Sequence, residues 1–204
     1  MNLDPAEIRI LGCLLEKERH TPEYYPLSLH ALTTACNQST NREPVVDYSE
    51  KLVEDTLYIL RDKKVVTAVF GAGSRVQKFR HNLPDLFTLD PREIAVLTVL
   101  LLRGAQTVGE IRSRSERVAA WNSLEEVETT LAALTGGDEP LVRTLPTRPG
   151  QKEQRHIHLL GSTPDEDPVP GRPLPGGPSR LDRLEAELTS LRAEFEQFKK
   201  QFES

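Results

Sequence analysis

The hydrophobic positions of the chain recur in two similar helical stripes. The segment LDPAEIRILGCLLEK, which begins at Leu3, matches LDPREIAVLTVLLLR, which begins at Leu89. Each copy opens with Asp-Pro and carries a glutamate at the third helical position. This arrangement is typical of a capped helix start, because proline needs no N–H there and the aspartate and glutamate form a capping box. Each copy therefore predicts a helix that begins at its proline.

A second match follows in the same order along the chain. SEKLVEDTLYIL begins at Ser49 and SLEEVETTLAAL begins at Ser123, and both read as amphipathic helices. A shorter helical pattern lies between the two matched segments in each copy. Apolar residues on these stripes are predicted to form the core: Ile8, Leu11, Leu15, Leu32, Leu57 and Leu60 in the first copy, and Ile94, Leu97, Leu101, Ile111, Leu131 and Leu134 in the second.

Each copy then changes to strand patterning. VVTAVF (65–70) faces VQKFRH (76–81), and LVRTLP (141–146) faces QRHIHLL (154–160), each pair across a glycine-bearing loop. Three helices followed by a hairpin is the winged-helix plan, a relative of the helix-turn-helix. We therefore expect a mainly α fold with small β-hairpins (α+β), built as a tandem winged-helix duplication with units at 1–88 and 89–160.

The tail carries a different pattern. Residues 161–179 are rich in proline and glycine and predict a linker, and residues 180–204 predict a coiled-coil helix. Its heptad stripe consists of Leu181, Leu184, Leu188, Leu191, Phe195, Phe198 and Phe202. Opposite charges at the flanking positions favour a parallel homo-oligomer. The alternative is that this stripe packs on the chain's own body.

The first copy contains two insertions that the second lacks, within residues 18–26 and 37–48. The second insertion belongs to NQSTNREPVVDYS, whose polar residues exceed what helix capping needs. We single out Asn37, Gln38, Asn41 and Arg42. They form either a polar network that holds a long loop to the body or a contact surface for a partner.

Composition narrows the class of protein. The chain has 204 residues, 37% of them hydrophobic and 28% charged, which suits a soluble globular protein. The net charge of −5 gives no global attraction to nucleic acid. No apolar run suggests a membrane span and the first residues lack a secretion signal, so we expect a cytoplasmic protein. The cysteines Cys13 and Cys36 are expected to be reduced core residues.

Longer motifs carry a family resemblance over residues 3–160. LLEKERHTPEYYPLSLHAL, ACNQSTNREPV, GAGSRVQKFRH, LLLRGAQTVGEIRSR and RHIHLL together resemble the YceH-like family of bacterial proteins. The resemblance implies a tandem winged-helix fold and a cytoplasmic location. It implies no particular activity, so no functional residue is transferred from it.

Charge separates two hypotheses for function. Both third helices are acidic where a DNA-reading helix needs Arg, Lys, Asn or Gln. The hairpins are basic, which favours contact of the wings with a DNA backbone through Arg75, Lys78, Arg80, Arg148, Lys152 and Arg155. A third basic group contains Arg103, Arg112, Arg114 and Arg117. The first hypothesis is a DNA-associated regulator, and the alternative is a protein-interaction platform that uses the acidic third helices.

Enzymatic motifs are weak. His156 and His158 alternate along a strand, but no other metal-binding side chain follows at a convincing spacing. The glycines between residues 71 and 73 precede a strand rather than a helix, so they predict a turn and not a phosphate loop. We therefore expect no enzyme activity, no catalytic residue, no cofactor and no metal.

Overall fold

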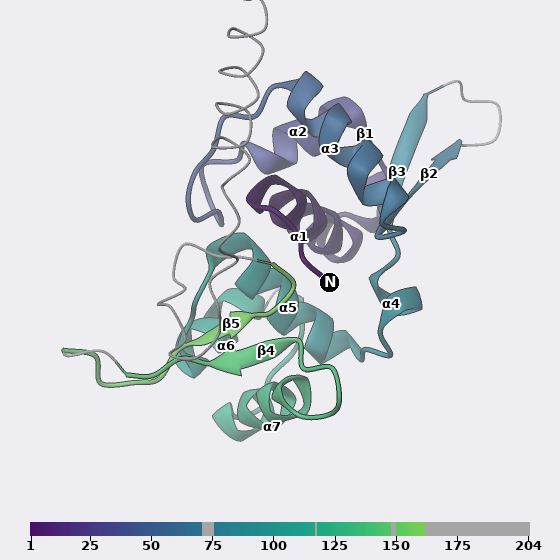
Figure 1. Ribbon diagram of the computed structural model, residues 1–204. Helices are drawn as coiled ribbons and strands as arrows, with labels where there is room; N and C mark the ends of the chain where they lie inside the picture. The colour runs from purple at the N-terminus through teal and green to yellow at the C-terminus, as the bar shows by residue number, and fades with distance from the viewer. Residues whose placement is uncertain (71–75, 117, 148–149, 162–204) are drawn as a thin grey trace, which may run out of the picture. The chain divides into compact units, whose positions relative to one another are not determined.

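Three helices, a three-stranded sheet and a short fourth helix form the first half of the chain (Figure 1). The structure is a computed structural model that describes residues 1–70, 76–116, 118–147 and 150–161. The elements of the first half are α1 (Pro5–His20), the 3-10 turn η1 (Pro22–Tyr24), β1 (Leu27–Ser28), α2 (Leu29–Cys36), α3 (Glu50–Asp62), β2 (Val66–Phe70), β3 (Gln77–His81) and the short α4 (Leu83–Leu86). The strands form an antiparallel sheet in the order β1-β3-β2, with Ala68 opposite Phe79.

The second half repeats this order with fewer elements. It contains α5 (Pro91–Arg103), α6 (Val108–Ser115), α7 (Leu124–Thr135), β4 (Val142–Thr144) and β5 (His156–His158). The antiparallel pair β4-β5 places Arg143 opposite Ile157. The pairing of β1 with β3 in the first half was not predicted, because a two-residue strand leaves no periodic pattern in the sequence.

The two predicted helix starts are confirmed. The side chain of Asp4 accepts a hydrogen bond from the Glu7 amide at 2.8 Å, and the Asp4 amide donates to the Glu7 carboxylate at 2.7 Å. Asp90 and Glu93 make the same reciprocal pair at the start of α5. Each cap contributes on the order of 1 kcal/mol and fixes where the helix begins.

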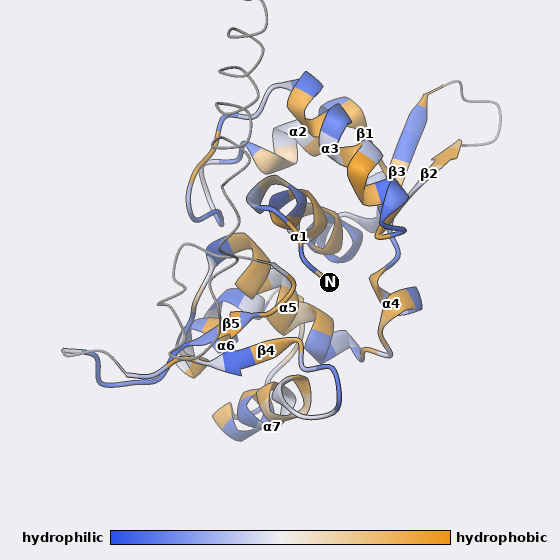
Figure 2. Ribbon diagram, viewed as in Figure 1, coloured by the Kyte–Doolittle hydropathy of each residue, from blue (hydrophilic) through white to orange (hydrophobic). Residues whose placement is uncertain are grey.

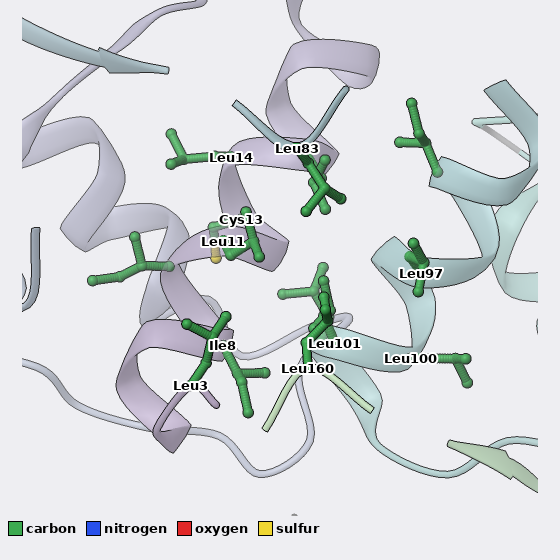
Figure 3. Packing of buried hydrophobic residues seen from close by; sticks show 14 of the residues in the cluster. Leu3, Ile8, Leu11, Cys13, Leu14, Leu83, Leu97, Leu100, Leu101 and Leu160 are labelled. Atoms are coloured by element: carbon green, nitrogen blue, oxygen red, sulfur yellow. The ribbon is translucent and has the colours of Figure 1, made fainter. Parts of the chain in front are cut away.

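A shared core joins the first helices of the two halves. All twelve core positions predicted from the helical stripes are buried. Figure 3 shows leucines of α1 and α5 in one cluster with Leu3, Leu83 and Leu160. The two helices approach closely at Gly12, where an added Cβ would lie 2.9 Å from Cδ2 of Leu102. The small residue on α1 therefore permits this helix contact.

The α+β fold class is confirmed, and the element order is compatible with the predicted tandem winged-helix arrangement. The described residues belong to one compact unit, Met1–Asp165, so the boundary between units 1–88 and 89–160 stays a prediction. The predicted linker beyond Gly161 and the coiled-coil stripe from Leu181 to Phe202 lie outside the described residues. Within the described ranges, no helix combines the length and the apolar character needed to cross a bilayer.

Candidate functional site

The insertion between α2 and α3, residues 37–49, is held to the body by side-chain hydrogen bonds. We call it the insertion loop. Asn37 closes it from within: its amide group donates to the Tyr48 carbonyl and its oxygen accepts from the Tyr48 amide, both at 2.8 Å. These two hydrogen bonds hold the ends of the insertion loop together, so Asn37 stabilises the loop itself.

Arg42 is the centre of the insertion loop and its side chain is fully buried. Nη1 and Nη2 donate to the two carboxylate oxygens of Glu16 on α1, at 3.1 and 2.6 Å. Three further acceptors complete the set: the Ala35 carbonyl at 3.0 Å, the Asn41 carbonyl at 2.9 Å and the Gln38 side chain at 3.1 Å. In this conformation Arg42 is an internal residue and presents nothing to a partner.

Electrostatics keep this buried pair ionised. Burial alone would raise the pKa of Glu16, but its hydrogen bond and charge interaction with Arg42 outweigh burial and lower the pKa. Burial would likewise lower the pKa of Arg42, and the pairing with Glu16 raises it instead. The bidentate geometry explains this balance, because charge-assisted bonds are strong away from water.

A second arginine, which the sequence did not single out, supports the same loop. Arg9 on α1 is buried and donates to the Cys36 carbonyl at 3.1 Å and to the Pro44 carbonyl at 2.6 Å. The signal in the sequence was a charged residue within the apolar stripe of α1, beside Ile8 and Ile10. Its acceptors are backbone atoms of a distant loop, which no local pattern reveals.

The insertion loop also contacts the second half of the chain. The Glu43 amide donates to the Leu102 carbonyl of α5 at 2.9 Å. The side chain of Arg103, also on α5, donates to the amide oxygen of Asn41. These bonds satisfy groups at the C-terminal end of α5, where helix carbonyls lack partners within the helix. The loop thus bridges the two repeats, and Asn41 is exposed at this junction.

The exposed face of α3 combines apolar and acidic side chains. Leu52, Tyr58 and Ile59 expose 42%, 60% and 44% of their surface, whereas the opposite face of the helix lies in the core. Asp55 and Asp62 share the stripe of Leu52 and Ile59, since these positions recur every three or four residues. Figure 2 shows strongly hydrophobic and strongly hydrophilic residues along α3. The two bases of the helix are already engaged, Lys51 with Asp55 at 2.7 Å and Arg61 with the ring of Tyr58, whose centroid lies 5.8 Å from its guanidinium carbon.

The predicted wing residues are only partly described. Arg75 and Arg148 lie outside the described residues. Lys78 and Arg80 flank the buried Phe79 on β3, so they share the face of the strand that points away from the core. In Figure 2, β3 is largely hydrophilic. Lys152 and Arg155 precede β5 in the second hairpin, with Lys152 exposed and Arg155 half-buried.

The two histidines of β5 have different surroundings. His156 is half-buried and its Nδ1 lies 3.2 Å from the Thr144 hydroxyl. His158 is 2% exposed, and burial lowers its pKa to about 4, so it is neutral at physiological pH. Within the described part of the chain, no group of three or more His, Cys, Asp or Glu side chains is arranged to hold a metal. The arrangement suits a packed hairpin.

Two adjacent tyrosines of the first insertion, Tyr24 and Tyr25, have different surroundings. Tyr25 packs on the core, and its hydroxyl accepts from the His81 amide at 2.8 Å. Tyr24 is exposed on η1. One tyrosine therefore fastens the insertion to the sheet, and the other faces solvent.

Comparisons with known proteins give the family. The family described as "Protein of unknown function, DUF480" matches residues 3–151. A UPF0502 protein of Solibacter usitatus is 46% identical over 206 residues, which cover 98% of both chains. UPF0502 proteins of Opitutus terrae and Geotalea uraniireducens are 48% and 44% identical, covering 93% and 100% of this chain and 83% and 99% of their own. The resemblance seen in the sequence motifs is thereby confirmed, and the chain belongs to the DUF480 family of UPF0502 proteins.

Proposed function

We propose that this protein is a non-enzymatic binding module that docks another protein on the exposed face of α3. The observation that carries the proposal is the set of three large apolar side chains, Leu52, Tyr58 and Ile59, exposed on one helix beside carboxylates. Apolar side chains clustered on a surface are typical of interaction sites when polar groups border them. In a winged helix this face of the third helix is the one available to a ligand.

The charges of α3 define the partner that fits. Its segment EKLVEDTLYILRD has four acidic and two basic residues, and Lys51 is already engaged with Asp55 at 2.7 Å. Phosphates of a nucleic acid would be repelled by this face. A protein with an apolar groove bordered by lysines or arginines is complementary to it. Tyr58 adds a large aromatic anchor, the kind of residue enriched at binding hot spots.

Affinity capture with matched variants tests this assignment. We expect a protein to be retained by the tagged parent after nuclease treatment and to be lost with Leu52→Ser/Ile59→Ser. The matched control is Leu124→Ser on α7, an exposed leucine at the start of the corresponding helix of the second copy. The purified partner should then bind the parent and the Leu124→Ser control tightly and Leu52→Ser/Ile59→Ser weakly, and its affinity for the parent should fall as the salt concentration rises.

Two results would count against α3 as the docking face. One is a partner that binds the α3 variant as tightly as the parent in purified form. The other is that every captured protein is lost on nuclease treatment, which would indicate that the protein binds nucleic acid instead. Unchanged unfolding curves of the variants confirm that surface chemistry alone was altered.

A second candidate is contact of the wings with a DNA backbone. It is supported by Lys78 and Arg80, which share the outward face of β3 and form no ion pair with a described residue. Backbone contact through such residues is insensitive to sequence. Charge reversal at both positions should then weaken binding to all duplexes alike and flatten its salt dependence. Duplex binding that the double variant retains would exclude this use of the first wing.

A cytoplasmic location completes the proposal. It is supported by Cys13 and Cys36, two neighbouring thiols that are both buried and free. Unpaired cysteines in a core suit a reducing compartment.

The homo-oligomer predicted from the tail would present several α3 faces together and raise avidity for a repeated partner.

A further inference from the structure

A small pocket opens where the insertion loop, α1, α5 and α6 meet. Its volume is about 250 Å³. Glu16 and His20 come from α1, Asn41 from the insertion loop, Arg103 from α5 and Arg114 from α6. None of its described lining residues belongs to α3 or to a strand of either hairpin. It contains two members of the third basic group of the sequence, for which the proposed function has no use.

Two carboxylates near this pocket, those of Glu16 and Glu110, already have cationic partners. Both oxygens of Glu16 are occupied by Arg42, which lies behind the pocket wall. Glu110 uses one oxygen to cap its own helix at the Thr107 amide and the other to bind Arg114 at 3.1 Å. These two ion pairs balance their own charges, and among the described residues the carboxylate of Glu43 remains without an ion pair and partly offsets the charge of Arg103.

Arg103 differs from the other arginines at this place. Its hydrogen-bond partner is the neutral side chain of Asn41, and among the described residues it forms no ion pair. Partial burial and the facing charge of Arg114 lower the pKa of Arg103, with Glu43 and Glu16 offsetting only part of this effect. Two guanidinium groups thus line one pocket, that of Arg114 paired with Glu110 and that of Arg103 without an ion pair among the described residues. An anion placed there would relieve their repulsion.

We propose that this pocket binds a small metabolite with an oxyanion group, a phosphate or a carboxylate, held by Arg103 and Arg114. The planar guanidinium matches both groups through paired N–H donors. Val99, Leu102 and Val118 supply an apolar wall for a short carbon skeleton. The volume is below the usual range for drug-sized ligands, so the ligand has few heavy atoms.

The position of the pocket gives such a ligand a structural effect. Its walls come from both repeats, so the bound anion contacts α1 and the insertion loop on one side and α5 and α6 on the other. A ligand that binds only this folded arrangement stabilises it in proportion to its concentration. Thermal unfolding of the full chain is therefore a direct measure of occupancy.

The test uses inorganic phosphate and succinate as probes, with sodium chloride adjusted to equal ionic strength. We expect the unfolding temperature of the parent to rise with one or both probes, and calorimetry to give saturable binding. Arg103→Gln and Arg114→Gln should each weaken binding roughly 10- to 100-fold, the effect of losing a charge-assisted bond. A response to phosphate alone assigns a phosphorylated ligand, and a response to succinate alone assigns a carboxylate.

Three further variants separate ligand binding from structure. Arg61→Gln removes an exposed arginine of α3 and should leave probe binding unchanged. Asn41→Ala removes the neutral partner of Arg103 and keeps both charges, so binding should persist. Arg103→Lys keeps the charge without the paired donors, so it should bind the probes more tightly than Arg103→Gln but less tightly than the parent. The proposal is overturned if neither probe binds the parent, or if Arg103→Gln binds them as the parent does.

Discussion

Replacing Arg42 by methionine should destabilise the protein strongly without touching its surface. The arginine side chain is 0% exposed and its partner Glu16 is 6% exposed, so the change leaves a buried carboxylate without its main partner. Lys17 remains near that carboxylate, at 3.6 Å, and offers only partial compensation. Breaking a buried ion pair in this way costs about 3–5 kcal/mol. Methionine preserves most of the aliphatic volume, so the loss reports on charge and hydrogen bonds.

Urea unfolding measures the effect. With a slope on the order of 2 kcal/mol/M, a loss of about 4 kcal/mol lowers the midpoint by about 2 M. Lys51→Met is the matched control, because Lys51 pairs with Asp55 on the exposed face of α3. Solvent screens exposed pairs of this kind, so this midpoint should barely move.

The double variant Glu16→Met/Arg42→Met examines the reason for the loss. If the penalty arises from the unpaired carboxylate, removing both charges should restore part of the stability lost in Arg42→Met. Additive losses would instead indicate that Arg42 acts mainly through the backbone carbonyls of Ala35 and Asn41. A single variant Arg42→Met within about 1 kcal/mol of the parent would refute the assignment of the insertion loop as a polar network fixed by this arginine.

Three other outcomes are expected. His158 accepts a proton below about pH 6.5 in the unfolded chain but only below about pH 4 in the folded one, so the free energy of unfolding should fall by up to about 3 kcal/mol as pH decreases through that window. Urea unfolding at several pH values should show a smaller decrease for His158→Leu, and an unchanged pH dependence contradicts this. Gly12→Val should destabilise the protein by about 1–3 kcal/mol, because the larger side chain separates α1 from α5. Gly109→Ala has open space around it and should stabilise the protein by about 0.5–1 kcal/mol, and equal effects of the two variants would contradict the close helix contact. Light scattering should show the full chain as an oligomer and Leu184→Asp/Leu191→Asp as a monomer, and two monomers would refute the predicted coiled coil.

Features that depend on neighbouring residues were predictable from the sequence. The caps at Asp4 and Asp90 rest on side chains three positions away, and both were confirmed. The buried stripes follow from helical periodicity, and every predicted core position is buried. The hairpins were found in the predicted places, with shorter strands than the pattern suggested.

Features that depend on distant contacts were not predictable. Arg42 was recognised as unusual, but the sequence left open whether it served the fold or a partner, because its partner Glu16 lies 26 positions away on α1. Arg9 was missed for the same reason. The apolar face of α3 was also hidden, since the sequence reading weighed the charges of this helix and not which apolar side chains remain exposed. Exposure is a tertiary property, decided by what the rest of the chain leaves uncovered.

The insertion loop is a difference between the two similar halves of the chain that also joins them. It belongs to the first copy by sequence, yet Glu43 and Asn41 bind the end of α5 in the second. The second copy is shorter between its own second and third helices, α6 and α7. The end of α5 is thus bound by the backbone of Glu43 and the side chain of Asn41, and Asn41 fixes Arg103 at the pocket from the other repeat. A symmetric duplication would have no such junction. The added residues thus contribute Asn41 to the pocket between the two repeats, and the ligand tests on Arg103 and Asn41 address this junction from both sides.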